Sequence, residues 1–276
     1  MSTPGLASVR PQSMLADAPD TPIAPSAEPA RVFTAALVVI GDEILSGRTQ
    51  DANIAYLAKW LGLQGIRLRE VRVVPDVTAA IVEAVNALRS AHDYLFTTGG
   101  IGPTHDDITV DAIAAAFAVP VVHHPDAVAI LTAHYGDRIN DARLRMARVP
   151  QGAELIANPR TQAPGIRIGN VFIMAGVPAI TRSMLESLDG MLPGGAPVLS
   201  RTIAAWTVES RVAGILAAVE KAHDGVQIGS YPFWRDGRTG ANFVIRSVDA
   251  ATLDATATAL CAALAADGID PVDGEL

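Results

Sequence analysis

The segment from Thr97 to Thr109, TTGGIGPTHDDIT, holds the residue types of this chain that are best suited to chemistry on a phosphate. Its glycines at 99, 100 and 102 can adopt positive φ angles and can turn backbone N–H groups towards an anion. A helix is expected to begin near Thr109, and its unpaired N–H groups and dipole favour a negative ligand. The segment is therefore expected to cradle a phosphate group.

Two acidic residues, Asp106 and Asp107, follow these glycines. A carboxylate repels a phosphate, so their position is best explained by a divalent cation, Mg²⁺, Mn²⁺ or Co²⁺, that bridges carboxylate and phosphate. Asp106 and Asp107 are therefore the predicted metal ligands. The alternative is an ordinary glycine-rich loop in which Asp107 or Thr109 caps the following helix.

The other polar residues of the loop are open to two interpretations each. Thr104 could donate its hydroxyl to a phosphate or only bond within the turn. His105 could protonate a leaving phosphate near neutral pH, or only contact solvent or ligand.

Outside the loop, the adjacent residues His123 and His124 are of a type that binds metal ions. Adjacent residues of a strand point to opposite faces, however, which disfavours a shared ion.

Composition sets the outer limits of the fold and of the partners. The chain has 276 residues, of which half are apolar, and a formal net charge of −8. This charge argues against broad attraction to nucleic acid or anionic lipid, and no apolar run is long enough to suggest a membrane span. Cys261 is the single cysteine and is expected to be a buried, inert thiol. A cytoplasmic protein without nucleic-acid or membrane partners is predicted.

The elements that position the loop form an alternating pattern. Residues 1–31 are rich in proline and alanine and are expected to be disordered. Residues 32–194 predict an α/β domain with a mostly parallel sheet covered on both faces, in which ligands bind beyond the carboxyl ends of the strands. Its strands are expected at 32–40, 67–74, 94–98, 153–156, 165–168 and 171–174, and its helices at 51–63, 77–91, 109–117, 178–188 and in two segments of 125–148 parted near 136.

A second, smaller α+β domain is predicted at 195–276, after the sequence LPGGAP at 192–197 breaks every regular pattern. Strands are expected at 198–206, 226–231 and 242–247, and helices at 208–222 and 251–266. This order suits a split-βαβ domain whose closing strand is short or absent. Tyr231, Phe233 and Trp234 either stack on a ligand ring or pack this domain.

Several motifs together carry a family resemblance. They are GDEILSG at 41–47 followed by Asp51 and Asn53, the glycine loop, APG at 163–165 and MAGVP at 174–178. In this order they resemble the molybdopterin-binding superfamily, and in particular the amino-terminal domain of CinA-type proteins, which is similar to that of FAD synthases. VES at 208–210 and GSYPF at 229–233 match the portion of the family that follows. The likeness runs from about residue 33 to residue 247.

The resemblance implies a three-layer αβα domain, usually in a homo-oligomer, that binds a pterin or an adenine dinucleotide phosphate at the carboxyl edge of its sheet. It implies divalent-metal-dependent hydrolysis of the pyrophosphate bond of ADP-ribose or FAD. A molybdopterin adenylyltransferase-like enzyme and a non-catalytic molybdopterin- or nucleotide-binding module are the alternatives. Because the chain ends soon after the small domain, deamidation of nicotinamide mononucleotide and FAD synthesis are not expected.

The resemblance also assigns residues. Asp107 matches the catalytic aspartate of the superfamily, Asp106 is the second predicted metal ligand, and Asp76 matches the second acidic position, although it could instead cap the next helix. From their place after the first strand, Asp42 and Glu43 could coordinate metal or hydrogen-bond a ribose or pterin, although Glu43 could instead be a solvated turn carboxylate. The remaining predicted ligand-binding positions surround the same edge of the sheet: Gly41, Gly99, Gly100, Gly102, Pro103, Thr104, His105, Asn158, Pro164, Gly176 and Pro178.

Overall fold

The structure is a computed structural model that describes residues 31–276. The disordered tail predicted at 1–31 lies outside the described residues, except for Arg31. The first part of the chain contains the strands β1 (Phe33–Ile40), β2 (Ile66–Val74), β3 (Tyr94–Thr98), β4 (Val121–His123), β5 (Arg148–Pro150), β6 (Glu154–Ile156), β7 (Gly165–Ile168) and β8 (Val171–Met174). Its helices are α1 (Asp42–Leu45), α2 (Asn53–Leu63), α3 (Thr78–Ala91), α4 (Thr109–Ala116), α5 (Pro125–Tyr135), η1 (Gly136–Arg138), α6 (Asp141–Leu144), η2 (Arg145–Ala147) and α7 (Pro178–Glu186).

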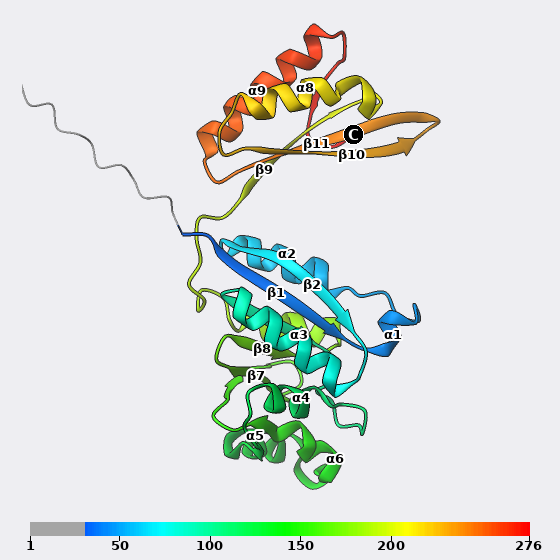
Figure 1. The fold of residues 1–276 in the computed structure, drawn as a ribbon. Helices are drawn as coiled ribbons and strands as arrows, with labels where there is room; N and C mark the ends of the chain where they lie inside the picture. The colour runs from blue at the N-terminus through cyan, green and yellow to red at the C-terminus, as the bar shows by residue number, and fades with distance from the viewer. Residues whose placement is uncertain (1–30) are drawn as a thin grey trace, which may run out of the picture. The chain divides into compact units, whose positions relative to one another are not determined.

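A six-stranded sheet forms the centre of this part, in the order β2-β1-β3-β8-β7-β6 (Figure 1). The pairs β1/β2, β1/β3 and β3/β8 are parallel, whereas β7 and β6 are antiparallel to their neighbours. The register pairs Ile40 with Val74, Val39 with Thr98, and Thr98 with Met174. The four parallel strands therefore end at one common edge, where ligands of such sheets bind.

Alternation along β1 explains why helices cover both faces of this sheet (Figure 1). Ala36, Val38 and Ile40 are buried against residues of α3 and α4. Ala35, Leu37 and Val39 are buried against residues of α2 and α7 on the other face. Since successive side chains of a strand point to opposite faces, a strand that is apolar throughout must be covered twice. The predicted three-layer αβα domain is confirmed.

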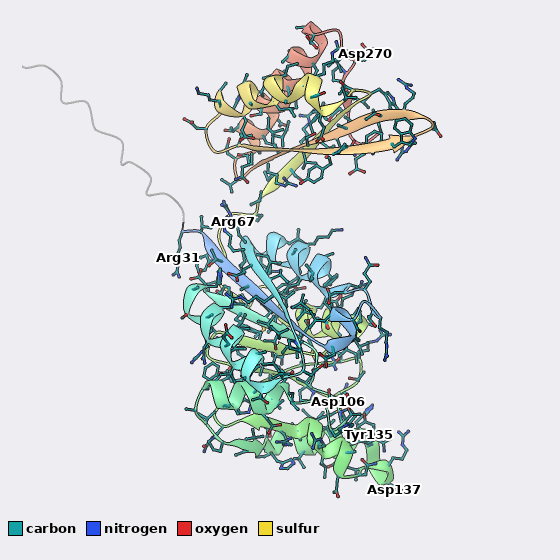
Figure 2. The ribbon with its side chains drawn as sticks, turned by 45° about the vertical axis from the view of Figure 1, so that its right-hand side comes forward. Arg31, Arg67, Asp106, Tyr135, Asp137 and Asp270 are labelled. Atoms are coloured by element: carbon teal, nitrogen blue, oxygen red, sulfur yellow. The ribbon has the colours of Figure 1, made fainter. Side chains whose placement is uncertain are left out.

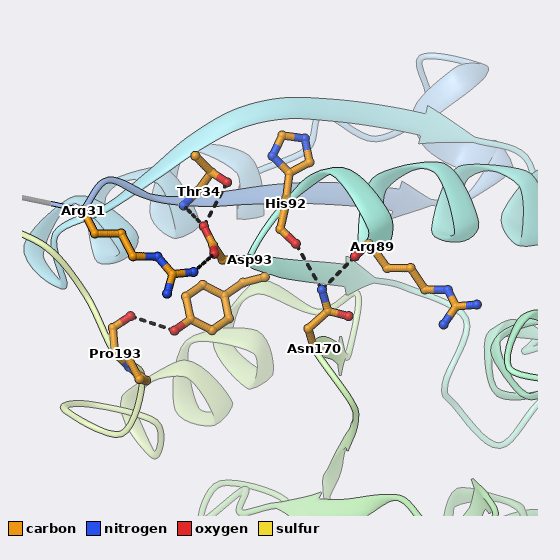
Figure 3. A network of polar contacts seen from close by, with 8 residues as sticks. Arg31, Thr34, Arg89, His92, Asp93, Asn170 and Pro193 are labelled. Carbon is orange, nitrogen blue, oxygen red and sulfur yellow. Dashed lines mark hydrogen bonds and ion pairs between the residues drawn. The ribbon is translucent and has the colours of Figure 1, made fainter.

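The two ends of the sheet differ in character. Figure 2 shows Arg31 at the start of β1 and Asp106 at the opposite end of the domain. At the amino end, the Asp93 carboxylate accepts a hydrogen bond from the backbone N–H of Thr34 at 2.8 Å and pairs with Arg31 (Figure 3). These contacts lower the pKa of Asp93, the N–H of Thr34 being the main cause. The acid that lies at this end is thus fully engaged in holding β1 beside β3.

Further contacts tie the same end together (Figure 3). The side-chain amide of Asn170 donates to the carbonyl oxygens of Arg89 and His92 at 2.9 and 3.1 Å, which joins the turn before β8 to the end of α3. The Tyr94 hydroxyl donates to the carbonyl oxygen of Pro193 at 2.7 Å. The amino end of the sheet is therefore closed by structural contacts.

The second part of the chain contains β9 (Leu199–Ala205), α8 (Glu209–Lys221), β10 (Gln227–Arg235), β11 (Arg238–Ser247), α9 (Ala250–Ala266) and β12 (Val272–Asp273). Its strands form an antiparallel sheet in the order β10-β11-β9-β12. The inward residues of β9 and β11 pack against α8 and α9. This is the predicted split-βαβ arrangement, and its closing strand is the short β12.

The structure corrects several predicted boundaries. The hairpin of β10 and β11 continues to Arg235 and starts again at Arg238, beyond the strands expected at 226–231 and 242–247. Asp236 and Gly237 adopt φ angles of 51° and 72°, the backbone of a tight hairpin turn. The small antiparallel pair of β4 and β5, which the helices α5 to η2 separate in the chain, was not predicted. In residues 31–276 no helix combines the length and the apolar character needed to cross a bilayer.

Candidate functional site

The glycine loop packs closely against the end of β1 and the start of α4. Gly99 and Gly100 have φ angles of 103° and 66°, which disfavour any residue with a side chain. A Cβ on Gly99 would lie 2.1 Å from the carbonyl oxygen of Ile40, at the end of β1. A Cβ on Gly100 would lie 2.2 Å from the hydroxyl oxygen of Thr109. The glycines are therefore required both by the turn and by the close approach of neighbouring atoms.

Helix α4 begins directly behind this loop without a side-chain cap. Its N-cap residue is Ile108, and no side-chain hydrogen bond caps it within the described part of the chain. The Thr109 hydroxyl donates instead to the carbonyl oxygen of Gly99 at 2.9 Å, and the Thr109 N–H donates to that of Gly100 at 3.0 Å. The interpretation of Asp107 or Thr109 as a cap is therefore wrong. No side chain of the loop caps α4, and the acid in its first turn, Asp111, is paired with Arg148.

The Asp107 carboxylate is held by its own loop. Its Oδ2 accepts hydrogen bonds from the backbone N–H of Thr104, at 2.8 Å, and from the Thr104 hydroxyl. A Cβ on Gly102 would lie 2.6 Å from the same Oδ2, so glycine is needed there as well. Both hydrogen bonds recorded for this carboxylate use Oδ2, which fixes its orientation and leaves Oδ1 as the atom that can serve a ligand.

The tip of the loop is exposed. Pro103, His105 and Asp106 all lie at the surface, and Figure 2 shows Asp106 at the edge of the domain. The nearby Thr104 side chain is the main cause that lowers the pKa of Asp106, and the backbone N–H of Asp106 itself is the second. Asp106 is thus kept ionised and accessible, as a metal ligand must be.

Asp76 lies on the same edge, at the end of β2. Its Oδ2 accepts a hydrogen bond from the backbone N–H of Asp42 at 3.0 Å, and it does not cap α3, whose N-cap residue is Val77. Burial is the main cause that raises the pKa of Asp76, and the charges of Asp42, Glu43 and Asp106 raise it further. The predicted acidic residues of β1, β2 and the glycine loop therefore act on one another across this edge.

Gly41 makes the turn from β1 into this acidic group. Its N–H donates to the carbonyl oxygen of Val74 at 3.2 Å, which extends the parallel pairing of β1 and β2 by one residue. A Cβ on Gly41 would lie 2.6 Å from both carboxylate oxygens of Glu43. Glycine at this position therefore lets Glu43 fold back over the end of the strand.

The donor set shows which kind of metal ion suits this edge. In residues 31–276 no group of three or more His, Cys, Asp or Glu side chains forms a ready-made metal cage. The side chains that gather here are carboxylates, and Asp76 is destabilised as an anion by three others. Oxygen donors suit Mg²⁺ or Mn²⁺, and Mg²⁺ is commonly held by one or two carboxylates together with the phosphates of the substrate. The residues therefore fit a hard divalent cation that binds with its phosphate ligand.

A hollow of about 60 Å³ lies on one side of the loop. Its walls include Glu43, Asn53 and Thr98, together with Gly176 and Pro178 of the turn into α7. The Asn53 side-chain amide donates to the carbonyl oxygen of Gly176 at 2.8 Å and thereby fixes that turn. The Thr98 hydroxyl is buried and has no hydrogen-bond partner among the described residues. Sequence reasoning missed Thr98, because a threonine in an apolar strand gives no separate signal.

A second hollow lies on the other side of the loop. It is lined by Gly102 and Asp107 of the loop, by Pro164, and by Arg145 and Arg148. Sequence reasoning predicted the first three of these residues and missed both arginines. They belong to a stretch that was expected to be helical, where an arginine is most simply explained as a solvated side chain.

Asn158 shapes the wall that carries Pro164. Its side-chain amide donates to the Thr161 hydroxyl at 2.6 Å and to the carbonyl oxygen of Ala163 at 2.8 Å, and its Oδ1 accepts from the N–H of Arg160 at 3.2 Å. Asn158 is 4% exposed, so its polar atoms are used within its own loop. A direct contact between Asn158 and a ligand stays a prediction.

The remaining candidates lie away from the glycine loop or serve the fold. The His124 ring accepts a hydrogen bond from the N–H of Asp126 and caps α5, and His123 is exposed on β4. Phe233 packs edge-on against Trp206 with ring centroids 5.5 Å apart, as the packing interpretation predicts. Trp234, by contrast, is 72% exposed and does not pack the domain.

Two family models match the chain. Residues 36–193 match the model of a probable molybdopterin binding domain, and residues 197–273 match the model of the FAD synthase middle domain. A CinA-like protein from Desulfosudis oleivorans is 33% identical over 214 residues, which cover 70% of this chain and 51% of that protein. A probable FAD synthase from Caenorhabditis briggsae is 30% identical over 265 residues, which cover 84% of this chain and 50% of that protein. The chain therefore spans about half the length of these two relatives.

Solved structures agree with this assignment. The crystal structure of CinA from Thermoplasma acidophilum, described as a protein of unknown function, superposes with a TM-score of 0.54 at 32% identity. The match covers 57% of this chain and 96% of that one. The resemblance that the sequence motifs carry is thus confirmed.

Proposed function

The chain belongs to the family of the probable molybdopterin binding domain, and on that premise we propose that it binds the phosphates of a nucleotide at the carboxyl edge of its sheet and hydrolyses a pyrophosphate bond. The proposed substrates are ADP-ribose and FAD, and the proposed cofactor is Mg²⁺, Mn²⁺ or Co²⁺. Molybdopterin, whose phosphate suits the same cradle, is the alternative ligand.

One observation carries this proposal. The glycine loop presents its backbone beside an uncapped helix start, while Asp107 is oriented within the same loop by two hydrogen bonds to one oxygen. Backbone N–H groups favour a phosphate, whereas a positioned carboxylate favours the removal of a proton from water. A carboxylate beside an anion cradle weakens simple anion binding, so its presence in this loop supports hydrolysis.

The proposed chemistry divides between the cation and the side chains. A bound divalent cation would neutralise phosphate charge and lower the pKa of a water molecule. The loop would hold the phosphates for in-line attack by water, and this positioning supplies much of the rate in phosphoryl transfer. Asp107 would accept a proton of the attacking water through Oδ1, since Thr104 occupies Oδ2. The bridging P–O bond would break as the new P–O bond forms, and AMP and the second phosphate product would leave. Asp106 and Asp76 supply oxygen ligands or hold water at the cation.

The Asp107→Ala and Asp107→Asn variants test this proposal. We expect turnover of ADP-ribose to fall by about 10²–10⁴-fold, the usual contribution of a general base, while affinity for ADP-ribose is largely kept. Asp137→Ala, which removes an exposed acid of η1, is the control and should retain the parental rate. Hydrolysis by Asp107→Ala at the parental rate would refute the catalytic role of Asp107.

The same assay separates the alternatives. A parental protein that binds ADP-ribose but does not hydrolyse it with any of the three metals would act as a binding module. A parental protein that transfers AMP from an added nucleoside triphosphate to an added pterin phosphate and releases pyrophosphate, without hydrolysing ADP-ribose, would act as a molybdopterin adenylyltransferase. The measured product, AMP in solution or AMP attached to the pterin, distinguishes these two outcomes from hydrolysis.

A further inference from the structure

Arg145 opens η2 on the wall of the second hollow, opposite the glycine loop. Its Nε is buried, and within residues 31–276 it has no hydrogen-bond partner. Arg145 also takes part in none of the ion pairs in the described part of the chain. A buried donor without a partner is rare in folded proteins, because it has lost the hydrogen bonds that water gave it.

The acids around this hollow do not need Arg145 as a partner. Asp111 of α4 is paired with Arg148, which lines the same hollow. Asp107 already accepts two hydrogen bonds from Thr104. Arg145 is therefore the one guanidinium lining this hollow whose charge is not matched by an acid of the described chain. Its partner is expected to be an anion that arrives from outside.

The position of Arg145 identifies the kind of anion. The same hollow is lined by Gly102 and Asp107, so Arg145 faces the loop proposed to bind the reacting phosphate. A guanidinium is planar and matches two oxygens of a phosphate at once. Resting on the proposed function, we infer that Arg145 binds the second phosphate of a pyrophosphate-containing ligand. It thus makes the site select a diphosphate over a monophosphate.

The groups around the proposed site carry charges of both signs. Asp76, whose pKa is raised by the charges of Asp42, Glu43 and Asp106, follows β2, whereas Arg145 lines the second hollow together with Asp107. We expect one phosphate of a diphosphate to bind at the glycine loop and the other to reach the Arg145 guanidinium. A monophosphate at the loop has no second phosphate to offer, so we expect it to gain less from Arg145.

The test compares Arg145→Met with Arg143→Gln. Arg143 stands two residues away, lies over the Tyr135 ring and donates to the carbonyl oxygen of Arg138, and it does not line the hollow, so its loss removes the same charge outside the hollow. Binding of ADP-ribose, inorganic pyrophosphate and AMP is measured by calorimetry both in EDTA and with Mg²⁺, and the Mg²⁺ measurements use the Asp107→Ala background, in which hydrolysis is expected to be slow. We expect Arg145→Met to weaken ADP-ribose and pyrophosphate binding at least about tenfold and AMP binding much less. Arg145→Lys should recover part of the loss, and Arg143→Gln should match the parental protein.

Melting temperature distinguishes a ligand-binding arginine from a structural one. Without ligand, Arg145→Met should melt at or above the parental temperature, because it removes an unpaired buried donor. A clear fall in melting temperature would assign Arg145 to the fold and overturn the inference. Parental affinity in Arg145→Met, or an equal loss for AMP and ADP-ribose, would overturn it as well, as would the absence of any pyrophosphate binding by the parental protein.

The inference and the proposed function can fail separately. If ADP-ribose binds through Arg145 but AMP is never released with any metal, hydrolysis is refuted and the diphosphate site stands. If Arg145→Met hydrolyses ADP-ribose with the parental KM, the diphosphate site is refuted and hydrolysis stands.

Discussion

Replacing Gly99 by alanine tests the packing of the glycine loop against the sheet. The φ angle of 103° would be strained for alanine, at a cost of about 1–2 kcal/mol. The added Cβ would also lie 2.1 Å from the carbonyl oxygen of Ile40, so the loop or the end of β1 must move. Forced repacking of this kind costs about 1–3 kcal/mol. The expected loss in the free energy of unfolding is therefore about 2–5 kcal/mol.

Gly152→Ala is the matched control for this variant. Gly152 also has a positive φ, 84°, but a Cβ there would meet no atom within 4 Å. The control should lose only the strain of about 1–2 kcal/mol. Calorimetric unfolding should show Gly99→Ala melting well below Gly152→Ala, since each kcal/mol lowers the melting temperature by about 2–4 °C in a protein of this size. Equal losses in the two variants would refute the close contact between Gly99 and Ile40.

Two further variants test the acidic edge and the wall of the first hollow. Folding raises the pKa of Asp76, so the folded chain binds the Asp76 proton more tightly than the unfolded chain does. Protonation of Asp76 therefore stabilises the fold at low pH, and this stabilisation is lost as the pH rises through the raised pKa. At pH 7 without metal, Asp76→Asn should therefore unfold at a higher urea concentration than the parental protein, and near pH 3 the two should unfold at the same concentration. Unfolding of Asp76→Asn at a lower urea concentration than the parental protein at pH 7 would contradict this reasoning. Asn53→Ala removes the hydrogen bond to Gly176 and should lower the free energy of unfolding, measured in urea, by about 1 kcal/mol. The control Asn86→Ala, at an exposed position of α3, should lower it by less. Equal losses in the two variants would show that the Asn53 contact does not stabilise the fold.

The fold could be predicted where burial and turns leave a clear pattern. The strand expected at 94–98 coincides with β3, because five buried residues stand between a polar turn and glycines. The hairpin of β10 and β11 was predicted too short, because Pro232 and the exposed Trp234 do not fit an apolar strand pattern. Its tip does carry a signal, since Asp236-Gly237 is a typical two-residue hairpin turn. β4 and β5 are only three residues each, too short for any periodicity to emerge.

The site could be predicted only where its residues lie close to one another in the sequence. Gly99, Gly100 and Asp107 belong to one continuous loop, so their types and order indicate its character. The helix-cap interpretation of Asp107 failed because the Thr104 N–H competes for the same carboxylate, and such competition depends on the backbone of the loop. Arg145 approaches the loop from a distant segment, so only the folded structure reveals it.

The measurement that tests the central claim most directly is the release of AMP from ADP-ribose and from FAD by the purified protein. It is made with Mg²⁺, Mn²⁺ or Co²⁺, and with EDTA as the control. We predict AMP release with at least one of these metals and none in EDTA. No release with any metal would contradict hydrolysis at the glycine loop, and release that persists in EDTA would contradict the role of the divalent cation.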